Sequence, residues 1–471
     1  MGIMHPPPIK ENTHQNGYDN GARNGSNGRT TQMAYEHSGA AKGFDPFASK
    51  MRRHGLPEAL IETFQHYYKE LLQGETGYIS SQAAQPVKTL PLARQLGAYA
   101  QAGKDALART VVLKLNGGLG STMGLEMPKS LLEVKEGFSF LDIIVRQHLY
   151  LRREHGVELP LIFMNSFNTE EATRAALQSY PALIQNVPLD FRQHKIPKIW
   201  QHDLSPATWE DAPEKEWCPP GHGNLYLAFY TSGILTQLVD SGYEYAFISN
   251  VDNLGATLDL TLLGYLAERN LPFLMEATAR TPADSKGGHL AQSAAQGLIL
   301  REVAQCPPAE LELFQDTARY RYFNTNNIWI NLAALKEMLE QNNGFIDLPL
   351  IRNEKPVDPT SPASALVYQL ETAMGQAIAV FPGAQAVEVG RERFLPVKRT
   401  SDLLALRSDL YLLARDYTIR RNPARKISED VIIELDEEFY GSLEQFEAHF
   451  ANGTPSLVNC RRLQIEGEIF F

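Results

Sequence analysis

The chain has 471 residues, of which 43% are hydrophobic and 21% charged, and its net charge is −11. This composition is that of an ordinary globular protein and argues against collagen-like, coiled-coil and wholly disordered chains. Because no basic run offers sites for a phosphate backbone, a nucleic-acid polymer is not an expected partner. An acidic protein that handles anions must build local positive sites from lysines, backbone N–H groups or a metal.

Three sequence features indicate a reducing, cytoplasmic setting without membrane association. The three cysteines form no CxxC pair and no Cys/His ligand spacing, so neither a disulfide framework nor a zinc module is indicated. No uninterrupted apolar run approaches the ~18–20 residues that a membrane span requires. The first residues also lack the apolar stretch of a secretory signal.

The first 107 residues predict a tail followed by a helical flank. Residues 1–46 are rich in glycine and asparagine and poor in large apolar side chains, which predicts a disordered tail without a catalytic part. Within the flank, 47–107, apolar residues recur at three- and four-residue spacing between Pro57 and Gly74, which predicts a helix. A weaker helical pattern follows over 90–107.

From residue 108 onward, strand and helix patterns alternate. Strands are predicted at 111–116, 159–166, 245–253, 271–278, 298–304 and 323–332, and helices at 139–155 and 169–178. Such alternation predicts an α/β fold with a mainly parallel sheet, helices on both faces, and ligands at the carboxyl ends of the strands. We expect one large catalytic domain over 108–395 and a short C-terminal region over 396–471, with helical patterns in much of 402–450.

The strongest single motif is KLNGGLGSTMGLEMPKS, residues 114–130. Glycines that follow a strand let backbone N–H groups approach a phosphate without obstruction by Cβ atoms. The spacing matches neither a Walker A loop nor a GxGxxG fingerprint, which argues against a nicotinamide dehydrogenase. A tight turn that binds nothing is the alternative, but Lys129 beside the loop offers a point charge for phosphate.

Three further motifs place polar residues beside glycines or at the end of an apolar strand. PPGHGN fixes the backbone around His222, whose imidazole we expect to be exposed; a rigid surface turn is the alternative. In SNVDNLGA, Asp252 follows an apolar strand, where a carboxylate suits Mg²⁺ in phosphoryl chemistry and an Asx turn is the alternative. FNTNNIWI places three asparagines in an otherwise apolar strand, where their amides suit sugar hydroxyls; a bulge or turn with locally bonded amides is the alternative.

A fifth motif, FLPVKRTSDLLAL, covers residues 394–406. Lys398 and Arg399 precede a predicted helix whose N-cap we expect to be Ser401. Without the other motifs, this basic pair would be read as a solvated surface feature.

Together, these motifs resemble the UTP–glucose-1-phosphate uridylyltransferase family, also called the UDP-glucose pyrophosphorylase family. The resemblance covers roughly residues 55–471 and includes FMNSFNT, FRQHKIPKI, MEATART and KGGHL in the same order. It implies a nucleotide-diphospho-sugar transferase fold of Rossmann-like type. It also implies the reversible formation of UDP-glucose and pyrophosphate from UTP and α-D-glucose 1-phosphate. Mg²⁺ would be the cofactor, and the sugar phosphate would attack the α-phosphorus directly.

The resemblance also implies roles for individual residues. Those on the UTP side would be Leu115, Asn116, Gly117, Gly118, Lys129, Gln193, Gly221 and Lys398. Those on the side of the sugar phosphate would be His222, Asn250, Val251, Asp252, Glu276, Gly288, Asn324 and Asn326. Lys129, Lys398 and Asp252 would carry the catalysis, with Asp252 as the metal ligand.

The chain departs from the family pattern in three places. Met127 stands where a glycine usually precedes Pro-Lys-Ser, and Asn224 stands where an aspartate usually follows Gly-His-Gly. Residues 455–471 resemble only the first rung of the left-handed β-helix through which many relatives oligomerise. We therefore expect a monomer or a weak homodimer.

Two alternatives remain open at the level of the sequence. The first is a uridylyltransferase for galactose 1-phosphate or N-acetylglucosamine 1-phosphate; the lack of an arginine between Gly120 and Gly124 favours the glucose type. The second is a non-catalytic homologue that binds nucleotide sugars. Such a homologue would be expected to lack Lys129, Asp252 or Lys398, and all three are present.

Overall fold

The computed structural model describes residues 43–210, 212–359, 361 and 363–471, so most of the predicted tail lies outside the described residues. Helix α1 (Asp45–Arg53) begins inside that predicted tail, because Asp45 and Pro46 suit the first turn of a helix. The helix predicted between Pro57 and Gly74 is confirmed as α2 (Glu58–Leu72). The weaker pattern over 90–107 corresponds to a short helix, α3 (Ala100–Ala106), between 3₁₀ turns.

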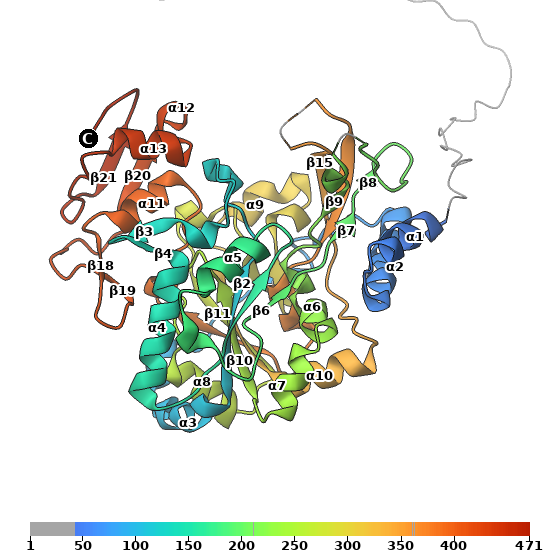
Figure 1. The fold of residues 1–471 in the computed structure, drawn as a ribbon, viewed down its shortest axis with the longest axis horizontal. Coiled ribbons are helices and arrows are strands. Elements are labelled where there is room, and N and C mark those ends of the chain that lie inside the picture. Colours follow the sequence, from blue (N-terminus) through green and yellow to red (C-terminus); the bar gives the residue numbers. More distant parts are fainter. Residues whose placement is uncertain (1–42, 211, 360, 362) are drawn as a thin grey trace, which may run out of the picture. The chain divides into compact units, whose positions relative to one another are not determined.

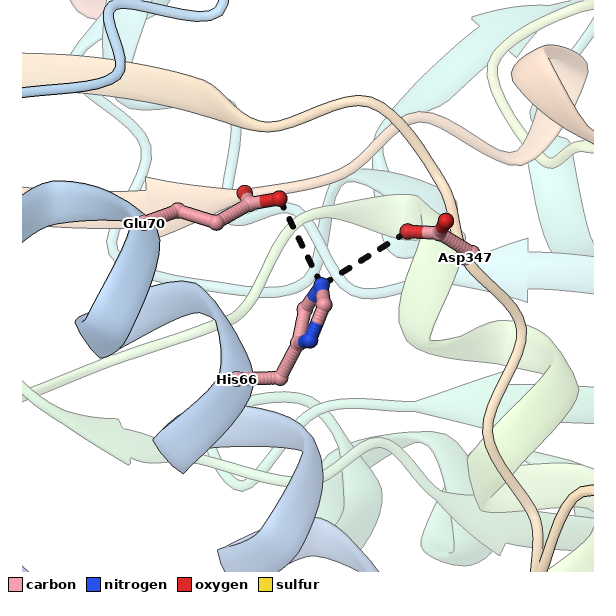
Figure 2. A group of neighbouring side chains, drawn as sticks. All are labelled: His66, Glu70 and Asp347. Atoms are coloured by element: carbon pink, nitrogen blue, oxygen red, sulfur yellow. Dashed lines mark ion pairs between the residues drawn. The ribbon is translucent and has the colours of Figure 1, made fainter. Parts of the chain in front are cut away.

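Helix α2 is tied to a loop of the catalytic domain that contains residues 344–350. The Tyr67 hydroxyl donates to the Leu348 carbonyl at 3.0 Å and accepts from the Leu348 N–H at 3.3 Å. Next to this contact, His66 and Glu70 of α2 face Asp347 (Figure 2). The His66 Nε2 atom lies 3.4 Å from Glu70 and 3.6 Å from Asp347. Helix α2 is therefore held against the 344–350 loop by specific polar contacts as well as apolar packing, and residues from 43 onward belong to one compact unit.

The described chain is built on a ten-stranded sheet, to which residues before 108 also contribute a strand (Figure 1). In one half, β6 (Asp190–Arg192), β5 (Leu161–Asn165), β2 (Thr110–Asn116) and β10 (Tyr245–Asn250) are parallel neighbours in that order. In the other half, β14 (Tyr322–Asn331) runs antiparallel to β10, β11 (Phe273–Ala279) and β12 (His289–Ser293). The remaining members are β1 (Gln85–Pro86), β13 (Gly297–Arg301) and β17 (Gln385–Val389).

The sheet is thus mixed, and the prediction of a mainly parallel sheet is correct for the half formed by β6, β5, β2 and β10 and for the β11–β17 pair. The other pairs are antiparallel, and one of them is the β12–β13 hairpin, in which Gly297 has a φ of +76°. Antiparallel neighbours can be joined by such a short turn, whereas parallel neighbours need a crossover connection. The sequence pattern of alternating strands and helices did not distinguish these two kinds of connection.

Helices cover both faces of the sheet, as predicted. Successive residues of β2 point to opposite faces: Val112 belongs to one apolar cluster and Leu113 to another. The Val112 cluster includes α3, α4 (Phe140–His155) and α8 (Leu260–Glu268). The Leu113 cluster includes α6 (Leu225–Thr231), α7 (Ile234–Asp240) and α10 (Leu332–Gln341). The predicted helix at 169–178 is α5 (Glu170–Leu177), and α9 (Leu311–Gln315) is a single short turn.

Smaller sheets lie outside the main one. They are formed by β3 (Glu133–Lys135) with β4 (Phe138–Ser139), by β7 (Ile196–Pro197) with β9 (Trp217–Cys218), and by β15 (Ile351–Pro356), β16 (Leu366–Glu371) and β8 (Ile199–Trp200). Across the part of the chain that the structure describes, no helix is long and apolar enough to cross a membrane.

The C-terminal region is less helical than predicted. Its helices α11 (Thr400–Arg407), α12 (Glu437–Tyr440) and α13 (Leu443–His449) alternate with β18 (Tyr411–Leu413), β19 (Ile419–Arg421), β20 (Ile432–Leu435) and β21 (Arg462–Ile465) (Figure 1). Strands β20 and β21 form a two-stranded parallel sheet. Leu404 and Phe446 belong to the same apolar cluster as Val112. The region therefore shares a core with the catalytic domain.

The N-cap of α11 differs from the prediction. The structure places it at Arg399, two residues before Ser401. The reason is the Asp402 side chain, which accepts the N–H groups of Lys398 and Arg399 at 2.8 and 2.9 Å. The backbone immediately around Lys398 is therefore held by the first turn of the helix.

Candidate active site

The parallel strands β2, β5 and β10 end at the same edge of the sheet, and the predicted site residues begin there. The Asn116 side chain donates to Asn165 and to Thr173, each at 2.8 Å, and Asn116 is fully buried. The Leu115 side chain is also part of the core. Both predicted UTP residues therefore have buried side chains, and the hydrogen bonds of Asn116 connect the end of β2 to the end of β5 and to α5.

Three predicted UTP residues from three separate segments meet beside this edge. A Cβ atom on Gly117 would lie 3.1 Å from Gln193 Oε1, and Gln193 Nε2 donates to the Gly221 carbonyl at 2.8 Å. In contrast, nothing lies within 4 Å of the corresponding position on Gly118. The glycine loop is therefore packed at Gly117 and open at Gly118, where a ligand can approach the backbone.

The glycine loop folds back onto Lys129. Gly120 adopts a φ of +71°, and a Cβ atom there would lie 2.7 Å from the Leu125 side chain. The Lys129 N–H donates to the Gly118 carbonyl at 3.1 Å. From the other side, the Thr122 hydroxyl donates to the Lys398 carbonyl at 2.9 Å. The loop is thus hydrogen-bonded to the main chain of both predicted catalytic lysines, Lys129 and Lys398.

All three predicted catalytic residues meet at one atom, Asp252 Oδ2. It accepts from Lys129 Nζ at 2.9 Å and from Lys398 Nζ at 2.7 Å. Burial raises the pKa of the Asp252 carboxyl, but the ammonium groups of Lys398 and Lys129 outweigh burial and hold that pKa below its usual value. The side chain of Lys398 is 60% exposed, whereas those of Lys129 and Asp252 are each 8% exposed. Of the three side chains, that of Lys398 is thus the most accessible to solvent.

The Asp252 carboxylate suits the expected Mg²⁺. Its second oxygen, Oδ1, is buried and has no hydrogen-bond partner among the described residues. Mg²⁺ is commonly held by one or two carboxylates together with substrate phosphates. Among the described residues, the one His/Cys/Asp/Glu trio spaced for a metal is His66, Glu70 and Asp347, which contains none of the predicted site residues. A metal at Asp252 would therefore depend on phosphate ligands from the substrates.

His222 is half-buried, so the prediction of an exposed imidazole is wrong. The Met374 N–H donates to His222 Nδ1 at 3.0 Å, which leaves the ring proton on Nε2. Burial, together with the positive charge of Lys398, lowers the pKa of His222 to about 4. The imidazole is therefore a neutral hydrogen-bond donor at neutral pH.

The backbone on either side of His222 is fixed. A Cβ atom on Gly221, whose φ is +76°, would lie 2.4 Å from the Thr372 carbonyl oxygen. The Asn224 side chain accepts from the His194 N–H at 3.0 Å, and its Nδ2 lies 3.1 Å from His194 Nδ1. Asn224, which stands where the family usually has an aspartate, thus has hydrogen-bond partners within the protein.

On the predicted sugar side, Gly288 and two asparagines lie together. The Asn324 N–H donates to the Gly288 carbonyl at 3.1 Å, and Asn324 Nδ2 donates to Asn326 Oδ1 at 2.8 Å. Asn326 has a φ of +57°, which an asparagine tolerates better than most residues. Asn250 ends β10, and the N–H of the next residue, Val251, donates to the Leu115 carbonyl at 3.1 Å.

The sequence analysis missed Glu302. A Cβ atom on Gly288 would lie within 2.6 Å of both Glu302 carboxylate oxygens, so the absence of a side chain makes room for this carboxylate. Burial raises the pKa of Glu302 to about 7. The local sequence LILREVA has no unusual feature, so only the fold reveals the position of Glu302.

The predicted role of Glu276 as a ligand for a glucose hydroxyl does not fit the structure. Glu276 is fully buried, and Arg393 binds it with two hydrogen bonds of 2.6 Å. Trp329 donates to Oε1 at 2.8 Å and Asn327 to Oε2 at 3.0 Å. A carboxylate offers about four acceptor positions. All of them are occupied, so Glu276 has none left for a sugar.

A glycine loop beside two lysines, at the strand ends of a mixed α/β sheet, is the arrangement of a protein that binds nucleotide phosphates. A family model described as UTP–glucose-1-phosphate uridylyltransferase matches residues 61–471. The chain belongs to this family of nucleotidyltransferases, which confirms the family and the enzyme class expected from the motifs.

Individual relatives agree with the family assignment. The chain is 37% identical over 420 residues to UTP–glucose-1-phosphate uridylyltransferase of Encephalitozoon cuniculi, with coverage of 89% of this chain and 82% of that protein. A crystal structure of UDP-glucose pyrophosphorylase from Leishmania major has a TM-score of 0.84 at 44% identity, covering 91% and 92% of the two chains. A second structure of that enzyme, in complex with UDP-glucose, has a TM-score of 0.84 at 44% identity and covers 89% and 90%.

Proposed function

We propose that the protein forms UDP-glucose and pyrophosphate from UTP and α-D-glucose 1-phosphate, with Mg²⁺ at Asp252. The observation that carries this proposal is the meeting of Lys129 and Lys398 at Asp252, beside a glycine loop with an open approach at Gly118. The names of the relatives and the UDP-glucose complex of the Leishmania major enzyme support the choice of substrates.

In the proposed reaction, an oxygen of the sugar phosphate attacks the α-phosphorus of UTP. A new P–O bond forms, the bond to the β-phosphate breaks, and pyrophosphate leaves with the electron pair of that bond. The attacking phosphate is already anionic, so no residue needs to remove a proton from it. Such transfers depend mainly on positioning and on neutralising negative charge.

The charges of the site suit the need to neutralise the negative charge of the phosphates. Asp252 holds Lys129 and Lys398 together before substrates bind, so the three groups carry a net charge of about +1. In the proposed mechanism, the ammonium groups turn toward the phosphates of the substrates, with Lys398 opposite the charge that develops in the transition state. Mg²⁺, when bound, would supply further charge neutralisation on the phosphate oxygens.

Neutral groups complete the proposed site. We place the uracil near Gln193 and Gly221, where the Gln193 amide already binds a backbone carbonyl. His222 would donate its Nε2–H to a phosphate or sugar oxygen. The glucose hydroxyls would lie against Gly288, Asn324 and Asn326, which are next to one another in the structure. Glu302 beside Gly288 is a further candidate ligand for a hydroxyl.

A panel of sugar 1-phosphates tests the proposed substrate. The purified protein is incubated with UTP, Mg²⁺ and glucose, galactose or N-acetylglucosamine 1-phosphate, and pyrophosphate release is followed. We expect the highest kcat/KM with glucose 1-phosphate. A preference for either other sugar would favour the alternative uridylyltransferase, and no release with any sugar would favour a non-catalytic homologue.

Two other expectations from the sequence stay predictions. A monomer or weak homodimer is expected, and light scattering over a range of protein concentrations measures the oligomeric state. A cytoplasmic location is expected, and imaging of the tagged full-length chain in its own cells tests that location.

A further inference from the structure

We propose that Asn253 is a positioning residue that sets Lys398 against Asp252. It would do so by clamping the main chain of residues 393–397, which leads into Lys398. The inference rests on the proposed function of Lys398 in uridylyl transfer. It adds a residue that touches neither substrate.

The Asn253 side chain binds the 393–397 segment with both ends of its amide. Its Nδ2 donates to the Arg393 carbonyl at 3.1 Å, and its Oδ1 accepts from the Leu395 N–H at 2.8 Å. Asn253 also forms an isolated antiparallel bridge with Pro396. Because Asn253 is only 2% exposed, water does not compete for these hydrogen bonds.

The clamp leads directly to the catalytic pair. The Val397 N–H donates to the Asp252 carbonyl at 3.2 Å, so the residue before Lys398 is bound to the main chain of Asp252. Asp252 and Asn253 are adjacent, as are Val397 and Lys398. The two segments therefore run side by side, and the Asn253 amide fixes their register just before Lys398 reaches Asp252.

The start of the clamped segment is anchored a second time. Arg393 forms its two 2.6 Å hydrogen bonds with Glu276 and also donates to the Thr257 carbonyl at 2.9 Å. Asn327, which donates to Glu276, lies 3.3 Å from the Arg393 carbonyl oxygen that Asn253 binds. The buried Glu276–Arg393 pair thus holds the beginning of the segment, and Asn253 holds the part nearer Lys398.

Lys398 needs support from its backbone because its own side chain is largely solvated. That side chain is 60% exposed, so the Asp252 carboxylate alone does not confine it. A fixed backbone limits the positions that the ammonium group can reach. An error of about 1 Å in such a group can reduce catalysis roughly 100-fold.

An asparagine amide suits the clamp because it offers a donor and an acceptor at once. Aspartate would keep the acceptor for the Leu395 N–H but lose the donor for the Arg393 carbonyl. Alanine would lose both. Asn253 Oδ1 also accepts from the Gly255 N–H at 3.2 Å, as in an Asx turn. A purely local turn would be the competing, structural role of this residue.

A double-mutant cycle separates these two roles. The kcat and the KM for UTP are measured for the wild type, Asn253→Ala, Lys398→Ala and the double variant, all as full-length chains. If Asn253 acts through Lys398, Asn253→Ala alone should lower kcat about 10- to 100-fold, with the UTP KM changed less than about 3-fold. In the Lys398→Ala background, the same change should lower kcat less than about 2-fold.

An equal loss of kcat from Asn253→Ala in both backgrounds would overturn the proposal. An inactive wild type would instead contradict the proposed function. The matched control is Asn331→Ala, which removes a helix cap: Asn331 Oδ1 accepts from the Ala334 N–H at 3.0 Å. This control should lower the melting temperature and leave kcat within about 2-fold of wild type.

A second readout does not depend on turnover and uses a variant that keeps part of the clamp. In Asn253→Asp, brief labelling with an amine reagent and mass spectrometry should show several-fold faster modification of Lys398 than in the wild type. An unchanged labelling rate would contradict the clamp. The same variant replaces Asn253→Ala in the cycle if the alanine variant does not fold.

Discussion

Lys129 and Lys398 place their ammonium nitrogens on the same oxygen atom of Asp252, at 2.9 and 2.7 Å. One lysine is buried under the glycine loop, and the other lies exposed near the start of the C-terminal region. A single carboxylate therefore gathers two positive charges from distant parts of the chain before any phosphate is bound. Preorganised charge of this kind needs no rearrangement of solvent during the reaction.

The first prediction concerns Lys398. Lys398→Ala should lose most of kcat, by about 100-fold or more, while the KM for UTP changes much less. The reason is that Lys398 is proposed to act on charge that develops only in the transition state. Steady-state kinetics measure both values, and Lys355→Ala, which removes an exposed lysine paired with Glu371, is the control. Equal factors of loss in kcat and in affinity would contradict a transition-state role.

The second prediction concerns Asp252. Asp252→Asn should abolish most activity and should also lower the melting temperature of the substrate-free protein. Removing one partner of a buried pair typically costs about 3–5 kcal/mol, because the ammonium group of Lys129 stays buried without its countercharge. Addition of UTP should raise the melting temperature of this variant more than that of the wild type, because the phosphates supply the missing charge. A smaller shift than in the wild type would argue against a phosphate site at these lysines.

The third prediction concerns Glu276. Glu276→Gln should lower the free energy of unfolding by about 3–5 kcal/mol, because Arg393 would stay buried without its charged partner. Urea denaturation measures this loss. If the remaining activity shows a glucose 1-phosphate KM within about 3-fold of wild type, the structural role holds. A large rise in that KM with unchanged stability would restore the sugar-binding role expected from the sequence.

The fourth prediction concerns the pH dependence of stability through Glu302. Its pKa is about 7 in the folded protein, against an ordinary value of 4.5. The folded state therefore keeps the proton longer than the unfolded state. This contribution to stability is fully present below pH 4.5 and is lost as the pH rises to about 7. The loss is on the order of 3 kcal/mol, since one unit of pKa shift corresponds to about 1.36 kcal/mol.

Glu302→Gln tests whether Glu302 lowers the stability of the folded protein as the pH rises, because glutamine resembles the protonated acid and does not titrate. Urea midpoints at pH 5 and pH 8 should differ less in the variant than in the wild type. At pH 8 the variant should be the more stable of the two. A wild type that gains stability relative to the variant between pH 5 and pH 8 would contradict the assignment.

Local sequence patterns were sufficient to predict part of the fold and site. The strand into Asn116, the glycine loop and the segment around Asp252 are continuous motifs, so their residue types and spacing indicated a phosphate site, and the family resemblance implied the roles of individual residues. The long helices α2 and α4 were likewise visible in their apolar spacing. These features depend on residues that are close in sequence.

The features that the sequence did not show depend on residues far apart in the chain. Glu276 meets Arg393 across 117 positions, so nothing near Glu276 marks it as one half of a buried pair. The Glu302 carboxylate lies beside Gly288 only because Gly288 has no side chain. The antiparallel course of β14 depends on pairing between strands, which alternating strand and helix patterns do not specify.

The stoichiometry of products tests most directly the proposal that the protein forms UDP-glucose and pyrophosphate from UTP and glucose 1-phosphate. The wild-type protein is incubated with UTP, glucose 1-phosphate and Mg²⁺, and all nucleotide and phosphate products are separated and quantified. We predict one UDP-glucose and one pyrophosphate for each UTP consumed, with almost no consumption when the sugar phosphate or Mg²⁺ is omitted. UTP consumed without UDP-glucose, or no consumption in the complete mixture, would contradict the account.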